Sequence, residues 1–128
     1  MGERVGEVEI KESKWIEYLG RVSDQELTRL YSQARGFIAL AHDEDFGMTV
    51  VEAIAQGTPV LAYNGGGYKE TVKEGVNGWL LESSDSESVV RGITKMEQTK
   101  WDLNKIIESA RPFSRENFIS KFKKVVEQ

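Results

Sequence analysis

Apolar residues follow two patterns along this chain: short continuous runs, typical of buried strands, and spacings of three and four, typical of one helix face. Strands are expected at residues 15–20, 37–41, 60–63 and 79–81. Helices are expected at residues 24–35, 48–56, 68–74 and 87–96, and from residue 114 to the end of the chain. Helices that alternate with strands in this way connect parallel strands. The predicted fold class is therefore α/β, a Rossmann-like parallel sheet with crossover helices.

Residues typical of helix ends support these boundaries. Ser23, with Glu26 three positions later, has the spacing of a capping box. Ser86 is the expected N-cap of the helix that carries Val89. Gly57 is expected just after the end of a helix, because glycine adopts the left-handed conformation that closes many helices.

Length and composition restrict the kind of protein further. The 128 residues fit one domain, which we place at residues 15–128 and which ends in a C-terminal helix; residues 1–14 are a poorly defined lead-in. The chain has no cysteine and one histidine, which excludes a disulfide framework, a thiolate metal site and a histidine-rich metal centre. No apolar run is long enough for a membrane span or a signal peptide, so a cytoplasmic location is expected.

The net charge of −4 argues against binding to nucleic acid, because phosphate contacts need a basic surface. The charge is uneven, however, since residues 103–128 carry six basic and three acidic side chains. A solvated helix face accounts for such a tail. Docking against an acidic partner or an anionic lipid surface is the alternative.

Ligands of open parallel sheets bind beyond the carboxyl ends of the strands. Residues 42–49 and residues 64–68 each follow a predicted strand, are polar or rich in glycine, and lead into a predicted helix. We therefore expect the functional site to be built from these segments.

The first of these segments contains a pair of glutamates around a predicted helix start. Glu44 lies in the loop that leaves the strand, Gly47 marks the start of the helix, and Glu52 lies one turn further on. The free amides of Met48 and Thr49, together with the positive end of the helix dipole, suit a phosphate group. The carboxylate of Glu52 leans back toward the same helix end and suits a ribose diol.

Each part also has a simpler interpretation. A glutamate in the first helical turns often only complements the helix dipole, and an acidic loop is usually solvated. The glycine-rich loop with Gly65 and Gly66 either needs a positive φ or lets a ligand approach the backbone closely. His42 is either structural or has a role near a bound sugar.

A family resemblance supports the ligand-binding interpretation. Glu44 and Glu52, with seven residues between them and Gly57-Thr58-Pro59-Val60 after them, resemble the retaining GT-B glycosyltransferases of group 1. Residues 18–34, 64–70 and 75–81 also fit this family. The resemblance covers about residues 15–126 and implies the C-terminal, donor-binding half of a GT-B enzyme.

The resemblance implies roles for the residues around the transferred sugar. Glu44 would be the catalytic residue, which hydrogen-bonds the hydroxyls of the sugar. The amides of Phe46 and Gly47 would contact the same hexose, and those of Met48 and Thr49 the pyrophosphate.

It also implies roles on the nucleoside side. Glu52 would hold the ribose hydroxyls, and Arg21 and Val22 would lie near the nucleobase. Gly65 and Gly66 would lie in a loop near the ligand.

The function implied is transfer of a mannose- or glucose-like hexose from a UDP-, GDP- or ADP-linked sugar, with retention and without a metal or other cofactor. Nothing before Trp15 matches the family's amino-terminal acceptor domain or the strands that carry its Arg/Lys pair. The chain is therefore expected to lack turnover of its own, and a nucleotide-sugar-binding module is the alternative function. The full-length protein is expected in the cytoplasm, with peripheral membrane association as an option.

Three other interpretations fit the sequence less well. Asp43 and Asp45 have the spacing of a metal-binding Asp-x-Asp, but not its strand context. Glycosidase carboxylates usually face each other across a cleft and do not bracket a helix start. A receiver-like signalling domain would need an acidic pair after the first strand, which is not present there.

Overall fold

A computed structural model describes residues 2–5, 8–11, 13–42 and 48–113 of the chain. The strands are β1 (Gly2–Val5), β2 (Val8–Lys11), β3 (Phe37–Ala39), β4 (Val60–Tyr63) and β5 (Gly78–Leu81). The helices are α1 (Asp24–Gln33), α2 (Met48–Ala55), α3 (Tyr68–Thr71), α4 (Ser86–Gln98), α5 (Leu103–Ala110) and the 3-10 turn η1 (Arg111–Phe113).

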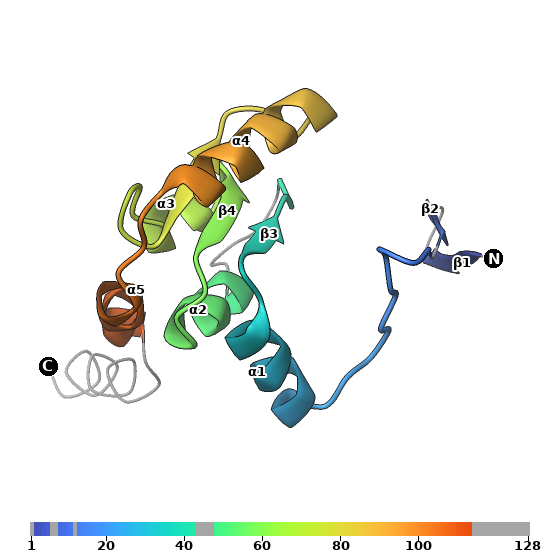
Figure 1. Ribbon diagram of the computed structural model, residues 1–128, viewed down its shortest axis with the longest axis horizontal. Helices are drawn as coiled ribbons and strands as arrows, with labels where there is room; N and C mark the ends of the chain where they lie inside the picture. Colours follow the sequence, from blue (N-terminus) through green and yellow to red (C-terminus); the bar gives the residue numbers. More distant parts are fainter. Residues whose placement is uncertain (1, 6–7, 12, 43–47, 114–128) are drawn as a thin grey trace, which may run out of the picture.

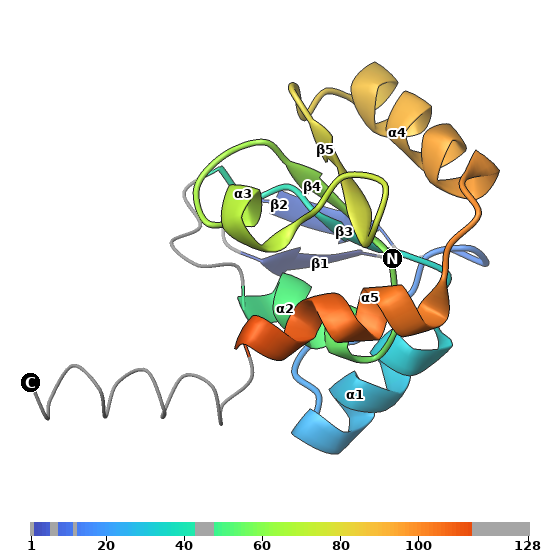
Figure 2. The ribbon, with the colours of Figure 1, turned by 90° about the vertical axis from the view of Figure 1, so that its left-hand side faces the viewer.

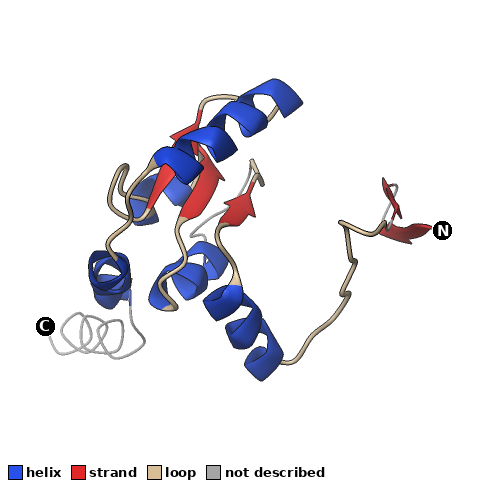
Figure 3. Ribbon diagram, viewed as in Figure 1, coloured by secondary structure: helices blue, strands red, loops and turns tan. Residues whose placement is uncertain are grey.

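The centre of the fold is a parallel sheet in the order β3-β4-β5 (Figure 3). Helix α4 covers one face of this sheet, and α2 and α5 lie on the other face with α1 beside α2 (Figures 1 and 2). Parallel strands with helices on both faces form a Rossmann-like α/β arrangement, so the predicted fold class is confirmed.

The middle strand, β4, is buried on both faces and divides the core in two. Val60 and Ala62 pack toward α2 and α5, whereas Leu61 packs with Leu81 and Met96 on the side of α4. This alternation is the two-residue period of a strand. A strand with helices on both faces has no polar face, which is why residues 60–63 form a continuous apolar run.

Glycine is required where β5 lies against β4. A Cβ on Gly78 would collide with the backbone carbonyl of Val60, its partner in the register. Because the obstacle is main chain, no rotamer change relieves it. Gly78 therefore permits the close pairing that places the carboxyl ends of β4 and β5 side by side.

The strand predicted at residues 15–20 is wrong. Apart from an isolated bridge between Ser13 and Ile16, this segment has no regular structure, and the Trp15 side chain is 85% exposed. A strand needs a neighbour for its backbone hydrogen bonds, and no described strand lies alongside. The antiparallel hairpin β1–β2, within the expected lead-in, lies apart from the parallel sheet (Figure 1).

Other differences concern the ends of elements. The strand predicted at 37–41 ends at Ala39 and is not fully buried, because β3 is the edge of its sheet and Ile38 is 42% exposed. The N-cap of α4 is Asp85, one residue before the predicted Ser86. Helix α3 ends three residues early, at Thr71. Helix α5 is not among the predicted helices, and the predicted helix from residue 114 lies outside the described residues.

Candidate functional site

Helix α2 begins in the segment where the sequence predicts a ligand site. Met48 and Thr49 occupy the first turn of this helix, as predicted, and both side chains are exposed. An α-helix leaves the amides of its first turn without partners inside the helix. Three further predicted site residues, Glu44, Phe46 and Gly47, lie outside the described residues.

Glu52 lies one turn further along α2 and lines a cleft of about 300 Å³ between α1 and α2. The lining residues are Asp24, Leu27, Thr28, Tyr31, Glu52, Ala55 and Gln56. The Glu52 side chain is exposed, and no salt bridge to it is formed by the described residues. An exposed carboxylate has acceptor positions for two neighbouring hydroxyl groups.

Tyr31 is a buried member of this cleft and is held firmly in place. Its ring meets Phe37 edge-on, with centroids 5.3 Å apart, and its backbone carbonyl accepts a hydrogen bond from the Thr58 hydroxyl. Burial raises the pKa of the Tyr31 hydroxyl, and the negative charge of Glu52 acts in the same direction. Tyr31 therefore stays protonated at neutral pH and remains a hydrogen-bond donor close to the Glu52 carboxylate.

The expected nucleobase neighbours, Arg21 and Val22, come directly before α1. Arg21 is exposed and Val22 is half-buried, and neither lines the cleft. Asp24, two residues after Val22, does line it. The structure thus places Asp24, but neither Arg21 nor Val22, in the wall of the cleft.

Gly65 and Gly66 follow β4 and have different reasons to be glycine. Gly66 has a φ of +55°, which other residues rarely adopt. At Gly65 the reason is space, since a Cβ would lie 2.8 Å from the Tyr63 ring. These observations explain both glycines by local structure, and approach of a ligand to them stays a prediction.

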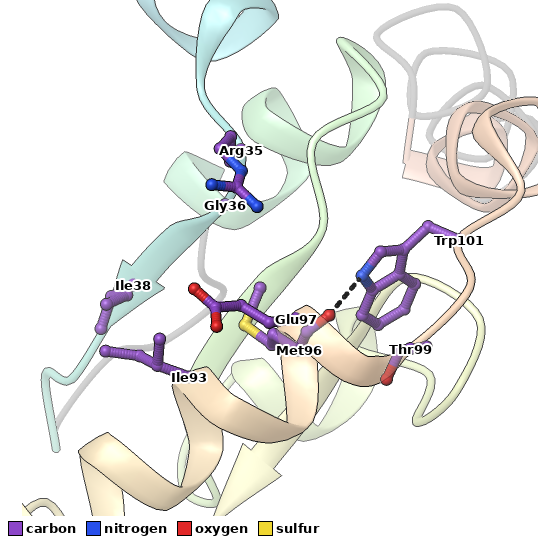
Figure 4. A pocket seen from close by; sticks show the side chains of 8 residues that line it. All are labelled: Arg35, Gly36, Ile38, Ile93, Met96, Glu97, Thr99 and Trp101. Atoms are coloured by element: carbon purple, nitrogen blue, oxygen red, sulfur yellow. Dashed lines mark hydrogen bonds between the residues drawn. The ribbon is translucent and has the colours of Figure 1, made fainter.

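A larger cavity, of about 410 Å³, lies away from all of these residues (Figure 4). Its lining consists of Arg35, Gly36, Ile38, Ile93, Met96, Glu97, Thr99 and Trp101. Arg35 and Gly36 precede β3, so this cavity reaches toward the amino end of the strand. The cleft beside Glu52 is lined by a carboxylate and an aromatic residue, and Glu52 lies about one turn from the start of α2. For this chemistry we assign the cleft, and not the larger cavity, as the candidate site.

Sequence reasoning missed the residues that α1 contributes to the cleft. Leu27 and Tyr31 of this helix pack against the core. They also reach the cleft because α1 and α2 lie side by side. Their spacing of four in the sequence signals a shared helix face, but it does not show that Glu52 lies opposite.

The parallel sheet, its flanking helices and the cleft beside Glu52 define a Rossmann-like α/β domain. Comparison with protein families identifies it further, because the model of the family "Glycosyl transferases group 1" matches residues 8–113. The chain belongs to this family.

Characterised relatives agree with this assignment. The chain is 30% identical over 104 residues to O-antigen chain mannosyltransferase B of Escherichia coli, covering 69% of this chain and 27% of that protein. It is 37% identical over 83 residues to D-inositol 3-phosphate glycosyltransferase of Mycolicibacterium gilvum, covering 65% and 18%. It is 36% identical over 78 residues to sucrose synthase of Acidithiobacillus caldus, covering 57% and 10%. The chain thus spans about a quarter or less of these relatives.

The described part of the chain contains neither a membrane-spanning helix nor a cluster of metal ligands. None of its helices combines the length and apolar character needed to cross a membrane. Within the same residues, no three His, Cys, Asp or Glu side chains gather closely enough to hold a metal ion.

Proposed function

We propose that this chain is the donor-binding domain of a glycosyltransferase that transfers a mannose- or glucose-like hexose from a nucleotide-diphosphate sugar. The position of Glu52 carries the proposal, because its carboxylate lines a cleft one turn from the start of α2. A nucleoside diphosphate has a diol and a pyrophosphate separated by a few bonds. Glu52 and the first-turn amides of α2 match these two groups in type and in order.

The nucleoside occupies the cleft between α1 and α2. Glu52 accepts hydrogen bonds from both ribose hydroxyls, and the base lies against Leu27 and Tyr31, which give the cleft an apolar and an aromatic wall. The segment with Arg21 and Val22 is then beside the base, since the chain continues from it to Asp24 in the cleft wall.

The pyrophosphate lies at the start of α2, where the amides of Met48 and Thr49 and the helix dipole stabilise negative charge. The same groups stabilise the charge that develops on the departing diphosphate, so the proposed reaction needs no metal. Glu44 and the amides of Phe46 and Gly47 hold the transferred sugar, and retention of the anomeric configuration follows from the family resemblance.

The whole protein's activity requires more than these residues. A transferase needs an acceptor site, which we assign to a separate amino-terminal domain of the longer protein. We expect that protein in the cytoplasm, where nucleotide sugars are used, with peripheral association to the inner membrane face when its acceptor is a lipid. By itself, the chain is a donor-binding module without turnover.

The experiment that tests this proposal is an amide-resolved NMR titration of the chain with UDP, GDP and ADP. We expect shifts in Asp24–Gln33 and in Met48–Ala55 for at least one nucleotide. Glu52→Ala should weaken binding about tenfold or more, because it removes two hydrogen bonds to a charged group.

The matched control is Glu87→Ala, which removes an exposed glutamate from α4. It should leave the affinity unchanged. A nucleotide that binds the wild-type chain and Glu52→Ala equally well would contradict the assignment of the cleft.

A further inference from the structure

The single histidine of the chain links the loops at the carboxyl ends of all three parallel strands. His42 follows β3, Tyr63 is the last residue of β4, and Ser84 follows β5. The His42 ring stacks on the Tyr63 ring, with centroids 4.0 Å apart and planes 13° apart. Its Nε2 atom lies 2.9 Å from the Ser84 hydroxyl oxygen. Side chains 42 residues apart in sequence are thereby joined.

The Ser84 end of this link is fixed to α4. Asp85 is the N-cap of that helix, and its carboxylate accepts hydrogen bonds from the Ser88 amide at 2.8 Å and from the Ser83 hydroxyl. These hydrogen bonds lower the pKa of Asp85 to about 2, so the carboxylate is charged and holds its partners throughout the physiological range. Ser84 lies between two residues of this network and is positioned by it.

The Tyr63 end is fixed to β5. The Asn64 amide donates to the Leu81 carbonyl at 2.7 Å, and the Asn64 side chain donates to the Glu82 carboxylate at 2.6 Å. The loops after β4 and β5 are therefore bound to each other independently of His42. The histidine adds the third loop to this pair.

These contacts lie at the surface, which points to a local effect. The His42 side chain is exposed, and one exposed hydrogen bond contributes little to the stability of a whole domain. Its place at the carboxyl edge of the sheet is, however, where ligands of such folds bind. None of His42, Tyr63 and Ser84 lines the cleft beside Glu52, so this link is separable from nucleoside binding.

We propose that His42 is a positioning residue for donor recognition. By stacking on Tyr63 and bonding to Ser84, it holds the start of the loop after β3 in register with the loops after β4 and β5. The chain leads from His42 directly to the residues that the proposed function assigns to the transferred sugar, so an anchored His42 limits where those residues begin. This inference rests on the proposed function and adds that affinity for the sugar part of the donor depends on His42, whereas affinity for the free nucleotide does not.

Calorimetric titrations of wild type, Ser84→Ala, His42→Phe and the double variant test the inference. Phenylalanine keeps a ring that can stack on Tyr63 but has no atom to bond to Ser84. The ligands are the nucleotide that binds in the NMR titration and its glucose and mannose conjugates. Each single variant should bind the preferred conjugate about threefold to tenfold more weakly and the free nucleotide as tightly as wild type. The double variant should be no weaker than the singles, since all three lose the same bond.

The control is Thr94→Val, which removes an exposed hydroxyl that bonds only within α4 and should change neither affinity. If neither Ser84→Ala nor His42→Phe changes the affinity for the conjugate, the proposed role of His42 is wrong and the proposed function still stands. Equal weakening of nucleotide and conjugate also overturns it, because the link would then act on the whole domain. A wild-type chain that binds neither kind of ligand overturns the proposed function, and the role of His42 with it.

Discussion

Asn77 shows how much a single side chain contributes to the arrangement of this domain. It is fully buried between α3 and β5. Its amide group donates to the Thr71 carbonyl at 3.1 Å and to the Ser109 hydroxyl at 3.0 Å, and its carbonyl oxygen accepts from the Lys73 amide at 2.8 Å. One side chain thus ties the turn before β5 both to α3 and to α5.

Asn77→Ala should therefore destabilise the chain by about 2 kcal/mol, because buried backbone groups lose their partners. Urea unfolding followed by circular dichroism measures the change. Asn104→Ala, at an exposed position on α5, is the matched control and should shift the midpoint little. Equal effects of the two substitutions would show that the buried network adds no stability.

At the same scale, sequence reasoning about the site had a clear limit. It placed Met48 and Thr49 at a helix start correctly, because a glycine before a periodic apolar segment marks such a start. It did not place Tyr31 opposite Glu52, since these residues are 21 positions apart and meet only through the packing of α1 on α2. Their proximity depends on tertiary structure, which spacing within one helix does not contain.

At the scale of elements, the sequence predicted a helix cap and the bounds of a strand correctly where these depend on neighbouring residues. Ser23 caps α1 through a 3.1 Å hydrogen bond from the Glu26 amide, as its spacing predicts. The bounds of β4 agree with its apolar run. The strand at residues 15–20 failed because an apolar run forms a strand only beside another strand. Helix α5 was missed although Asp102 caps it and Ile106 and Ala110 give it a buried face, so the signal was present.

The cap of α4 gives a prediction for pH. The pKa of Asp85 is lowered from 3.8 to about 2 by its hydrogen bonds in the folded chain, so its carboxylate stabilises the fold above about pH 4. This contribution is lost as the pH falls through about 2. Thermal melting should show Asp85→Ala a few degrees below wild type at neutral pH, and the gap should narrow as the solution is acidified.

The matched control is Asp85→Asn, which keeps an oxygen that can cap the helix but does not titrate. Its difference in melting temperature from Asp85→Ala should stay constant over the same range. A gap between wild type and Asp85→Ala that is the same in neutral and acidic solution would contradict the assigned pKa.

At the scale of the whole molecule, a larger cavity and a smaller cleft among the described residues each have room for a ligand. The larger cavity is apolar along much of its wall and lies against the edge strand β3, near exposed Ile38 (Figure 4). The smaller cleft is lined by Glu52 and Tyr31, and Glu52 lies about one turn from the start of α2. Chemistry, and not size, favours the smaller cleft as the nucleotide site.

The most direct test of this account is a crystal structure of the chain soaked with the nucleoside diphosphate that binds in the NMR titration. The account predicts the ribose hydroxyls within hydrogen-bond distance of the Glu52 carboxylate, the base between α1 and α2, and the pyrophosphate at the start of α2. A nucleotide ordered instead in the cavity between Arg35 and Trp101, with the cleft beside Glu52 empty, would contradict it.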